Sequence, residues 1–106
     1  MYGTIARFRL KPGMEEAVLQ QLDEFEAANV PGALGEFVYR TDDDPNEYYV
    51  AVMFANKAAY VANANTPEQH ARYRKWRALL EADPEWHDGE IICAMNFIPQ
   101  NAKSEQ

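Results

Sequence analysis

Apolar and polar side chains alternate over residues 2–10 of the chain. A period of two is that of a β-strand, because successive side chains leave a strand on opposite sides. The same alternation recurs at residues 33–40 and 47–55, on either side of an Asp- and Pro-rich turn at residues 42–46, and predicts a hairpin. Residues 90–98 are nearly all apolar, which predicts a fourth strand.

A period of three to four residues predicts helices between these strands. One apolar stripe lies among acidic and amide side chains: Met14, Val18, Leu22, Phe25 and Ala28. Farther along, Asn56 can cap a short helix that ends near Ala64. Thr66 stands before a proline and three residues before a glutamine, which is the pattern of a helix N-terminus with a capping box. We expect this last helix to run to about Ala82 and to stop before Pro84.

The order strand, helix, strand, strand, helix, strand, with the second helix in two pieces, is that of a ferredoxin-like βαββαβ domain. It predicts an α+β fold in which helices cover one face of a four-stranded antiparallel sheet. We assign residues 1–100 to this single domain and residues 101–106, which are polar and terminal, to a tail. His87 and Asp88 precede the expected last strand and are predicted to form a turn.

Both faces of the predicted sheet are apolar. Val50 and Val52 share one side of the third strand, and Met53 lies on the other. The last strand is apolar on both sides, so Cys93 within it is expected to be a buried small hydrophobe. Since the helices can cover only one face, the other would be an exposed apolar patch. We therefore expect a symmetric homodimer whose two sheets pack face to face as a barrel.

Charge and composition exclude several classes of partner. The 106 residues carry a net charge of −7, so no nucleic-acid partner is expected, and the basic run at residues 72–77 is interpreted as a solvated helix face. No apolar run approaches the roughly 20 residues of a membrane span, and no secretory leader is visible. The single cysteine fits a reducing compartment, and we expect a cytoplasmic protein. The common metal, nucleotide and hydrolase motifs are missing from the sequence.

Three stretches together resemble a known family. They are the Lys-Pro-Gly turn between a strand and an acidic helix (residues 8–16), the segment Phe-Ala-Asn-Lys-Ala-Ala-Tyr (residues 54–60), and the Thr-Pro pair at residues 66–67. In this combination the chain resembles the antibiotic biosynthesis monooxygenase family over about residues 2–98. The resemblance implies a dimeric α+β barrel. It also implies an oxygenase with no metal or flavin cofactor of its own, which binds an aromatic substrate between sheet and helices.

Haem-degrading relatives form one branch of this family, and the chain departs from their pattern. Nine residues after the aromatic that matches Phe54, where they have a catalytic Trp, this chain has Asn63. Their first-strand Asn is missing from residues 4–7, and the position of their haem-ligating His falls near Arg72 and Tyr73. The resemblance therefore favours a quinol-like or other small aromatic substrate over haem.

Two residues are candidates for catalysis. His70, early in the last helix, could act as a base in a pocket between helix and sheet, and Asn63 could hold a ring-shaped substrate. The alternatives are a boundary histidine with an ordinary hydrogen bond and a helix-capping asparagine. The expected substrate-binding residues are aromatic apart from one arginine: Tyr60, Tyr73, Trp76, Phe54 and Arg7. The aromatic residues can equally belong to the core, and Arg7 can equally pair with Glu36 or with a second subunit.

Three hypotheses for function remain open at this point. The first is a cofactor-independent monooxygenase acting on a small aromatic or quinol-like molecule. The second is a binding module for a small hydrophobic metabolite, and the third is a structural dimer without either activity. The space under the last two helical segments distinguishes them, because an open cavity that reaches His70 or Asn63 favours the first two.

Overall fold

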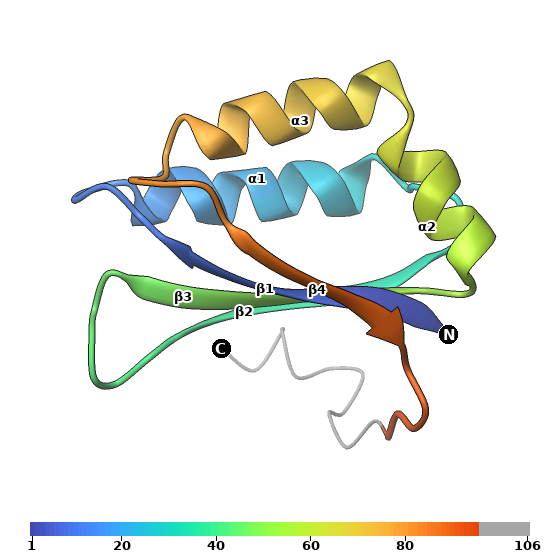
Figure 1. Cartoon of the computed structure of the whole chain (residues 1–106). Helices are drawn as coiled ribbons and strands as arrows, with labels where there is room; N and C mark the ends of the chain where they lie inside the picture. The colour runs from blue at the N-terminus through green and yellow to red at the C-terminus, as the bar shows by residue number, and fades with distance from the viewer. Residues whose placement is uncertain (96–106) are drawn as a thin grey trace, which may run out of the picture.

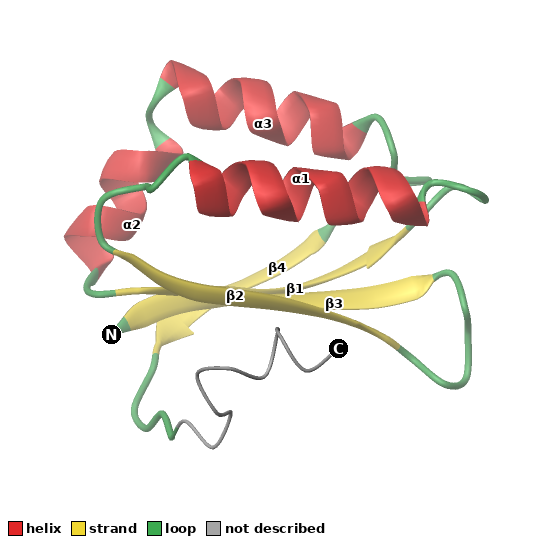
Figure 2. Cartoon of the chain, turned by 180° about the vertical axis from the view of Figure 1, so that it is seen from behind, coloured by secondary structure: helices red, strands yellow, loops and turns green. Residues whose placement is uncertain are grey.

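The computed structural model describes residues 1–95 of the chain. In chain order its elements are β1 (Tyr2–Arg9), α1 (Glu15–Ala27), β2 (Ala33–Arg40), β3 (Glu47–Phe54), α2 (Lys57–Ala64), α3 (Pro67–Arg77) and β4 (Glu85–Glu90). The strands form one antiparallel sheet in the order β2-β3-β1-β4. Within residues 1–95, the three helices lie on one face of this sheet and none lies on the other (Figures 1 and 2). The predicted ferredoxin-like α+β fold is confirmed.

Side-chain caps start the second and third helices where the sequence places them. The Ala59 N–H donates to Asn56 Oδ1 at 2.8 Å, and the Gln69 N–H donates to Thr66 Oγ1 at 3.1 Å. Both predicted N-caps are therefore confirmed. A side-chain oxygen at this position satisfies one of the donors that the first helical turn leaves without a partner.

The third helix ends at Arg77, so the predicted end near Ala82 is wrong. After the helix, the chain turns toward the end of β1. There Leu80 forms an isolated bridge with Leu10, and the Lys11 N–H donates to the Leu79 carbonyl at 2.9 Å. These tertiary hydrogen bonds replace those of another helical turn.

The predicted last strand is also wrong in its position. The strand is Glu85–Glu90, which includes His87 and Asp88, and residues 91–95 are irregular. It is an edge strand that pairs with β1 through its backbone, and this pairing requires no apolar run. Cys93 is exposed rather than buried. The remainder of the predicted strand and the predicted tail lie outside the described residues.

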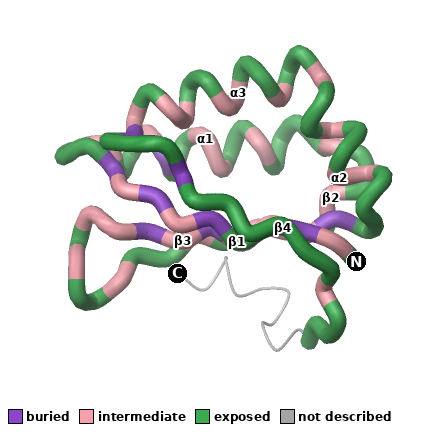
Figure 3. Tube along the Cα trace, in the orientation of Figure 1, coloured by how far each residue is buried: buried purple, intermediate pink, exposed green. Residues whose placement is uncertain are grey.

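The core lies between the sheet and the helices, as the buried positions in Figure 3 show. It is formed by alternate strand residues together with residues from α1 and the α3–β4 connection: Ala6, Phe8, Tyr48, Val50, Val18, Leu10 and Leu80. On the opposite face Ile5, Phe37 and Tyr39 are 54%, 54% and 51% exposed. The Tyr39 and Tyr49 rings stack there with their centroids 5.5 Å apart. This apolar outer face of β1–β3 is the one from which the sequence predicts a dimer.

Candidate functional site

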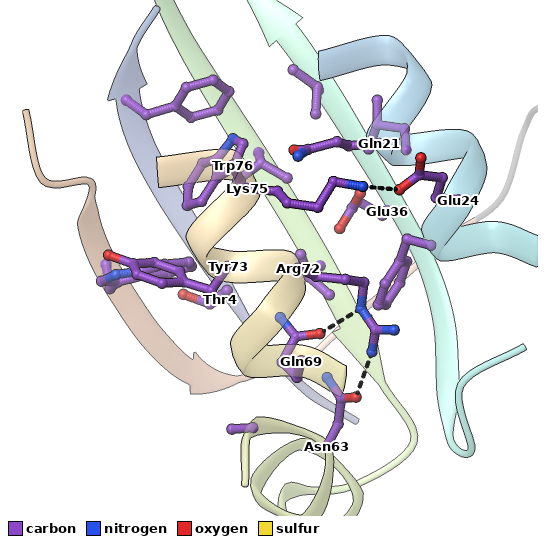
Figure 4. Close-up of a pocket in the computed structure, with 18 of the residues that line it drawn as sticks. Thr4, Gln21, Glu24, Glu36, Asn63, Gln69, Arg72, Tyr73, Lys75 and Trp76 are labelled. Atoms are coloured by element: carbon purple, nitrogen blue, oxygen red, sulfur yellow. Dashed lines mark hydrogen bonds and ion pairs between the residues drawn. The ribbon is translucent and has the colours of Figure 1, made fainter. Parts of the chain in front are cut away.

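A cavity of about 610 Å³ lies between the helix-facing side of the sheet and helices α1 and α3, with α2 at one end. Figure 4 shows the side chains that surround it. Small-molecule sites in proteins have volumes of about 300–1,000 Å³ and are mostly apolar with a few polar groups. The cavity has both properties. Its apolar floor is formed by Val38 of the edge strand β2 and by Val50 and Val52 of its hairpin partner β3.

One wall of the cavity is aromatic. The Trp76 ring lies 5.0 Å from that of Phe8, 6.0 Å from that of Tyr73 and 5.6 Å from that of Trp86, measured between ring centroids. These contacts join α3 to β1 and to β4. Aromatic side chains at such distances hold each other in edge-to-face or tilted arrangements, so this wall is preformed. It offers ring surfaces to a planar ligand.

A polar cluster with one cation lies at the α2 end. Arg72 Nε donates to Gln69 Oε1 at 3.0 Å, and its Nη2 donates to Asn63 Oδ1 at 3.4 Å. The guanidinium also lies over the Phe25 ring, 5.6 Å from its centroid. Within residues 1–95, no carboxylate forms an ion pair with Arg72. The cluster fixes the Asn63 side chain through its oxygen, and no hydrogen bond from its amide nitrogen occurs among the described residues.

A second set of polar side chains forms a row across the floor. Glu36 of β2 and Thr4 of β1 both pair with Val52 of β3, and Thr4 also pairs with Asp88 of β4. Side chains in register on adjacent strands point to the same face, and this row faces the helices. Glu36, Thr4 and Asp88 all line the cavity. The row therefore places two carboxyl groups and a hydroxyl along one line of the floor.

The members of this row differ in their partners. Asp88 Oδ1 accepts a hydrogen bond from the Tyr60 hydroxyl at 3.0 Å. Thr4 is 5% exposed, and its Oγ1 has no hydrogen-bond partner among the described residues. Within the same part of the chain, no hydrogen bond or ion pair reaches Glu36. The row thus contains two polar groups that a ligand could satisfy.

Burial changes the acidity of two groups that line the cavity. It raises the pKa of Glu36 to about 7, because an ionised carboxylate is poorly solvated among apolar side chains. It also raises the pKa of Tyr60 to about 12, with a further rise from its hydrogen bond to Asp88 and an opposing effect of the nearby Thr4 hydroxyl. At neutral pH Glu36 is therefore close to half ionised, which suits a group that takes up and releases a proton.

The structure brings together all but one of the residues that the sequence singles out. His70, Asn63, Tyr60, Tyr73, Trp76 and Phe54 line the cavity. His70 is exposed at its rim, whereas Phe54 is almost fully buried.

Arg7 lies apart from these residues, on the outer face of the sheet. Its Nε pairs with Glu47 Oε2 at 2.5 Å, and its Nη1 lies 3.8 Å from Glu85 Oε2. The expected pairing of Arg7 with Glu36 is wrong, because Glu36 points to the helix-facing side.

Sequence reasoning missed Glu36, Thr4, Arg72 and Asp88 as parts of the site. Glu36 carries a usable signal, since it alternates in phase with Val38 and therefore shares its face. Asp88 carries none, because its segment is not predicted to be a strand.

Residues 1–95 show neither a metal-ion site nor a membrane-spanning helix. No group of three or more His, Cys, Asp or Glu side chains that could hold a metal ion occurs there. In the same part of the chain, none of the helices has the length and apolar character needed to span a bilayer.

Comparison with known proteins gives one family and many similar folds. The family model for antibiotic biosynthesis monooxygenase matches residues 1–76. No curated protein matches the sequence. Among solved structures, an antibiotic biosynthesis monooxygenase family protein from Chloroflexus aurantiacus J-10-fl has a TM-score of 0.72 and 25% identity, over 90% of this chain and 96% of that one.

Two further structures are similar in fold. SnoaB, a cofactor-independent oxygenase from Streptomyces nogalater, has a TM-score of 0.74 and 18% identity, over 89% of this chain and 95% of that one. A protein of unknown function from Nitrosomonas europaea has a TM-score of 0.68 and 25% identity, over 90% of this chain and 92% of that one. With its family-model match, its sheet topology and its covered cavity, the chain belongs to the antibiotic biosynthesis monooxygenase family.

Proposed function

We propose that the protein is a cofactor-independent monooxygenase that acts on a small aromatic or quinol-like molecule in the cavity between sheet and helices. The observation that carries this proposal is the cavity itself, which combines an aromatic wall, an apolar floor and two polar side chains, Glu36 and Thr4, that form no well-formed side-chain hydrogen bond among the described residues. Family membership supports it, as does the similar fold of SnoaB, a cofactor-independent oxygenase. The substrate's own electron-rich ring would supply the electrons that reduce oxygen.

The cavity residues would contribute binding, orientation and exclusion of water. Trp76 and Tyr73 would pack against the substrate ring, and the valine floor would keep the reacting carbon in a dry environment. For a substrate with a ring CH₂ group, one atom of O₂ becomes the carbonyl oxygen of the product. The other atom leaves as water with the two hydrogens that the carbonyl replaces, so the equation balances.

His70 and Asn63 are the residues that we propose for catalysis. His70 lies at the rim, where a base can exchange protons with solvent. Asn63 is held by Arg72 through its side-chain oxygen, so its amide hydrogens can bind a developing negative charge on the substrate oxygen. Tyr60, Tyr73, Trp76 and Phe54 would form the substrate-binding surface.

Oxygen consumption tests this proposal directly. The protein is incubated with a panel of hydroquinones and anthrones in an oxygen-electrode cell, and we expect uptake above the blank with at least one of them. His70→Ala should lower the rate by about 10²-fold or more, as expected for the loss of a general base. It should leave the thermal midpoint unchanged.

Gln20→Ala, a substitution at an exposed residue of α1 outside the cavity, is the control and should change neither quantity. A destabilisation above about 2 kcal/mol in His70→Ala would assign that residue a structural role. Binding of these compounds without oxygen uptake would contradict the enzyme and leave a binding module for a small hydrophobic metabolite. No uptake and no binding would contradict both.

We also propose that the protein is a homodimer in which a second copy covers the outer face of the sheet. In a single chain, this face exposes an apolar surface to water that includes Ile5, Phe37 and Tyr39. The outer-face positions of β1–β3 lie in one continuous patch, because their registers are aligned across the sheet. We further propose a cytoplasmic location, since the exposed thiol of Cys93 would stay reduced there.

A further inference from the structure

Glu36 and Thr4 are two polar side chains on the helix-facing side of the sheet, and neither forms a hydrogen bond of good geometry through its side chain within residues 1–95. Each pairs with Val52, one from β2 and the other from β1. We propose that this pair recognises a planar aromatic molecule with a hydroxyl group at one edge of its ring and an oxygen acceptor at the opposite edge. Glu36 binds the hydroxyl and takes its proton, and Thr4 donates to the acceptor. This inference rests on the proposed function and names the substrate class.

The spacing of the strands sets the size of this ligand. Adjacent strands lie about 4.8 Å apart, so Glu36 and Thr4, which are two strands apart, are separated by roughly 10 Å along the floor. A single ring with para oxygens and one hydrogen bond from each oxygen covers this span. The ring itself would lie over Val52, whose apolar side chain occupies the middle of the row.

Thr4 supplies one end of the recognition. Its hydroxyl is buried and forms no hydrogen bond of good geometry within residues 1–95; its polar neighbour is the Tyr60 hydroxyl, whose pKa it lowers. A buried hydroxyl without a well-formed hydrogen bond costs free energy. A hydroxyl both donates and accepts, so it can serve an ether, carbonyl or hydroxyl oxygen of the ligand. Asp88, next to it in the row, is already engaged by Tyr60. Thr4 is therefore the group that a ligand at this end would meet.

Glu36 supplies the other end. The other ionisable side chains around the cavity, apart from its tyrosines, come from α1 (Glu24), α3 (His70, Arg72, Arg74 and Lys75) and β4 (Asp88). Lys75 Nζ binds Glu24 Oε2 at 3.0 Å, and Arg72 is held by two side-chain oxygens, so neither cation pairs with Glu36. The Glu36 carboxyl thus stays available for a ligand.

Its chemistry suits the removal of a proton. Burial places the pKa of Glu36 near neutrality, so the carboxylate can accept the hydroxyl proton at physiological pH. In that step the ligand O–H bond breaks and an O–H bond forms on Glu36. The ligand keeps the electron pair as a phenolate. The added negative charge makes the ring a better electron donor toward oxygen.

Binding of three air-stable probes tests this inference. 4-Methoxyphenol has both the hydroxyl and the acceptor, 1,4-dimethoxybenzene lacks the hydroxyl, and 4-ethylphenol lacks the acceptor. Calorimetric titration of the whole chain at pH 8 should show 4-methoxyphenol binding at least tenfold more tightly than either relative. Glu36→Leu should abolish the preference for 4-methoxyphenol over 1,4-dimethoxybenzene and keep its preference over 4-ethylphenol. Thr4→Val should abolish the preference for 4-methoxyphenol over 4-ethylphenol and keep its preference over 1,4-dimethoxybenzene.

Further arms make each outcome decisive. In the wild type the hydroxyl preference should decline from pH 8 to pH 5 as Glu36 becomes protonated, and in Glu36→Leu it should be flat. Glu36→Gln repeats the test if Glu36→Leu does not fold, and Glu16→Gln, on the solvent side of α1, is the matched control that should keep every preference. Equal preferences in wild type and variants would overturn the inference while leaving the proposed function in place. So would oxygen uptake from the hydroquinone panel without binding of any probe. Failure of both probes and oxygen uptake would overturn the proposed function itself.

Discussion

The hydroxyl of Tyr60 donates a hydrogen bond to Asp88 Oδ1 across 3.0 Å and joins α2 to the edge strand β4. The same ring contacts Phe54 edge-on, with 5.6 Å between the centroids. One side chain therefore links α2, the helix at one end of the cavity, to the strands β3 and β4. This connection predicts a small, measurable contribution to stability.

We expect Tyr60→Phe to lower the free energy of unfolding by about 1 kcal/mol, the typical contribution of one hydrogen bond. The ring and its packing remain, so only the bond to Asp88 is lost. Urea denaturation measures the change. Tyr2→Phe is the control, because no hydrogen bond of the Tyr2 hydroxyl occurs within residues 1–95. Equal losses in the two variants would contradict a role for the bond.

Thr4→Val should leave stability unchanged or raise it by up to about 1 kcal/mol. Valine has the shape of threonine, and the hydroxyl that it removes is buried and forms no hydrogen bond of good geometry within residues 1–95. Thr66→Ala should instead cost about 1 kcal/mol, because the Thr66 hydroxyl caps α3. Thermal and urea unfolding of both variants measure these changes in stability, and so compare a threonine hydroxyl without a well-formed hydrogen bond with one that caps a helix. A clear loss of stability in Thr4→Val would show that its hydroxyl has a partner in solution.

The raised pKa of Glu36 predicts a pH-dependent stability. With an ordinary pKa of 4.5 and a folded-state pKa of about 7, the folded protein keeps this proton where the unfolded chain releases it. Stability from this group is therefore fully present below pH 4.5 and is lost as the pH rises to about 7. The free energy of unfolding should fall by up to about 3 kcal/mol over this range, at about 1.4 kcal/mol per pKa unit.

Other carboxyl groups titrate over part of the same range, so the informative quantity is the difference between the wild type and Glu36→Gln. This difference should slope downward from pH 4.5 to pH 7 and level off above it. Urea denaturation at a fixed protein concentration measures it. A difference that does not change with pH would show that Glu36 has an ordinary pKa.

The outer face of the sheet gives a test of the proposed dimer. Phe37→Asp places a charge on that face, in the edge strand β2, and Leu19→Asp places one on the solvent side of α1. Phe37 is 54% exposed and Leu19 is 52% exposed in the single chain, so a monomer would tolerate both alike. In sedimentation velocity, we expect a dimeric wild type and Leu19→Asp variant, and a monomeric Phe37→Asp variant. A wild type that sediments at its chain mass of 12.1 kDa would contradict the dimer.

The sequence predicts those elements whose local pattern and tertiary role agree. Apolar and polar residues alternate along strands β1–β3 because one face of these strands packs on helices. Asn56 and Thr66 cap helices through hydrogen bonds to residues only three positions later in the sequence. The edge strand β4 lacks such a pattern. Its residues Glu85–Glu90 are all exposed, and its position is set by pairing with β1 rather than by an apolar face.

The parts of the site that lie close together in the sequence can be predicted from it, and the parts that depend on strand pairing cannot. Aromatic and polar residues of α2 and α3 are near each other in sequence, so the sequence alone groups His70, Asn63 and Tyr60. The row of Glu36 and Thr4 depends on the register among three strands, which no local pattern determines. For the same reason the sequence groups Arg7 with residues from which the sheet separates it.

The central claim is that the cavity under α1 and α3 binds a planar aromatic molecule. Methyl and indole NMR spectra of the labelled protein, titrated with 4-methoxyphenol, test this claim most directly. We expect ring-current shifts at the methyl groups of Val50 and Val52 and at the indole N–H of Trp76, with Ile5 on the outer face unchanged. Shifts confined to Ile5, or no saturable shift at any of these groups, would contradict the account.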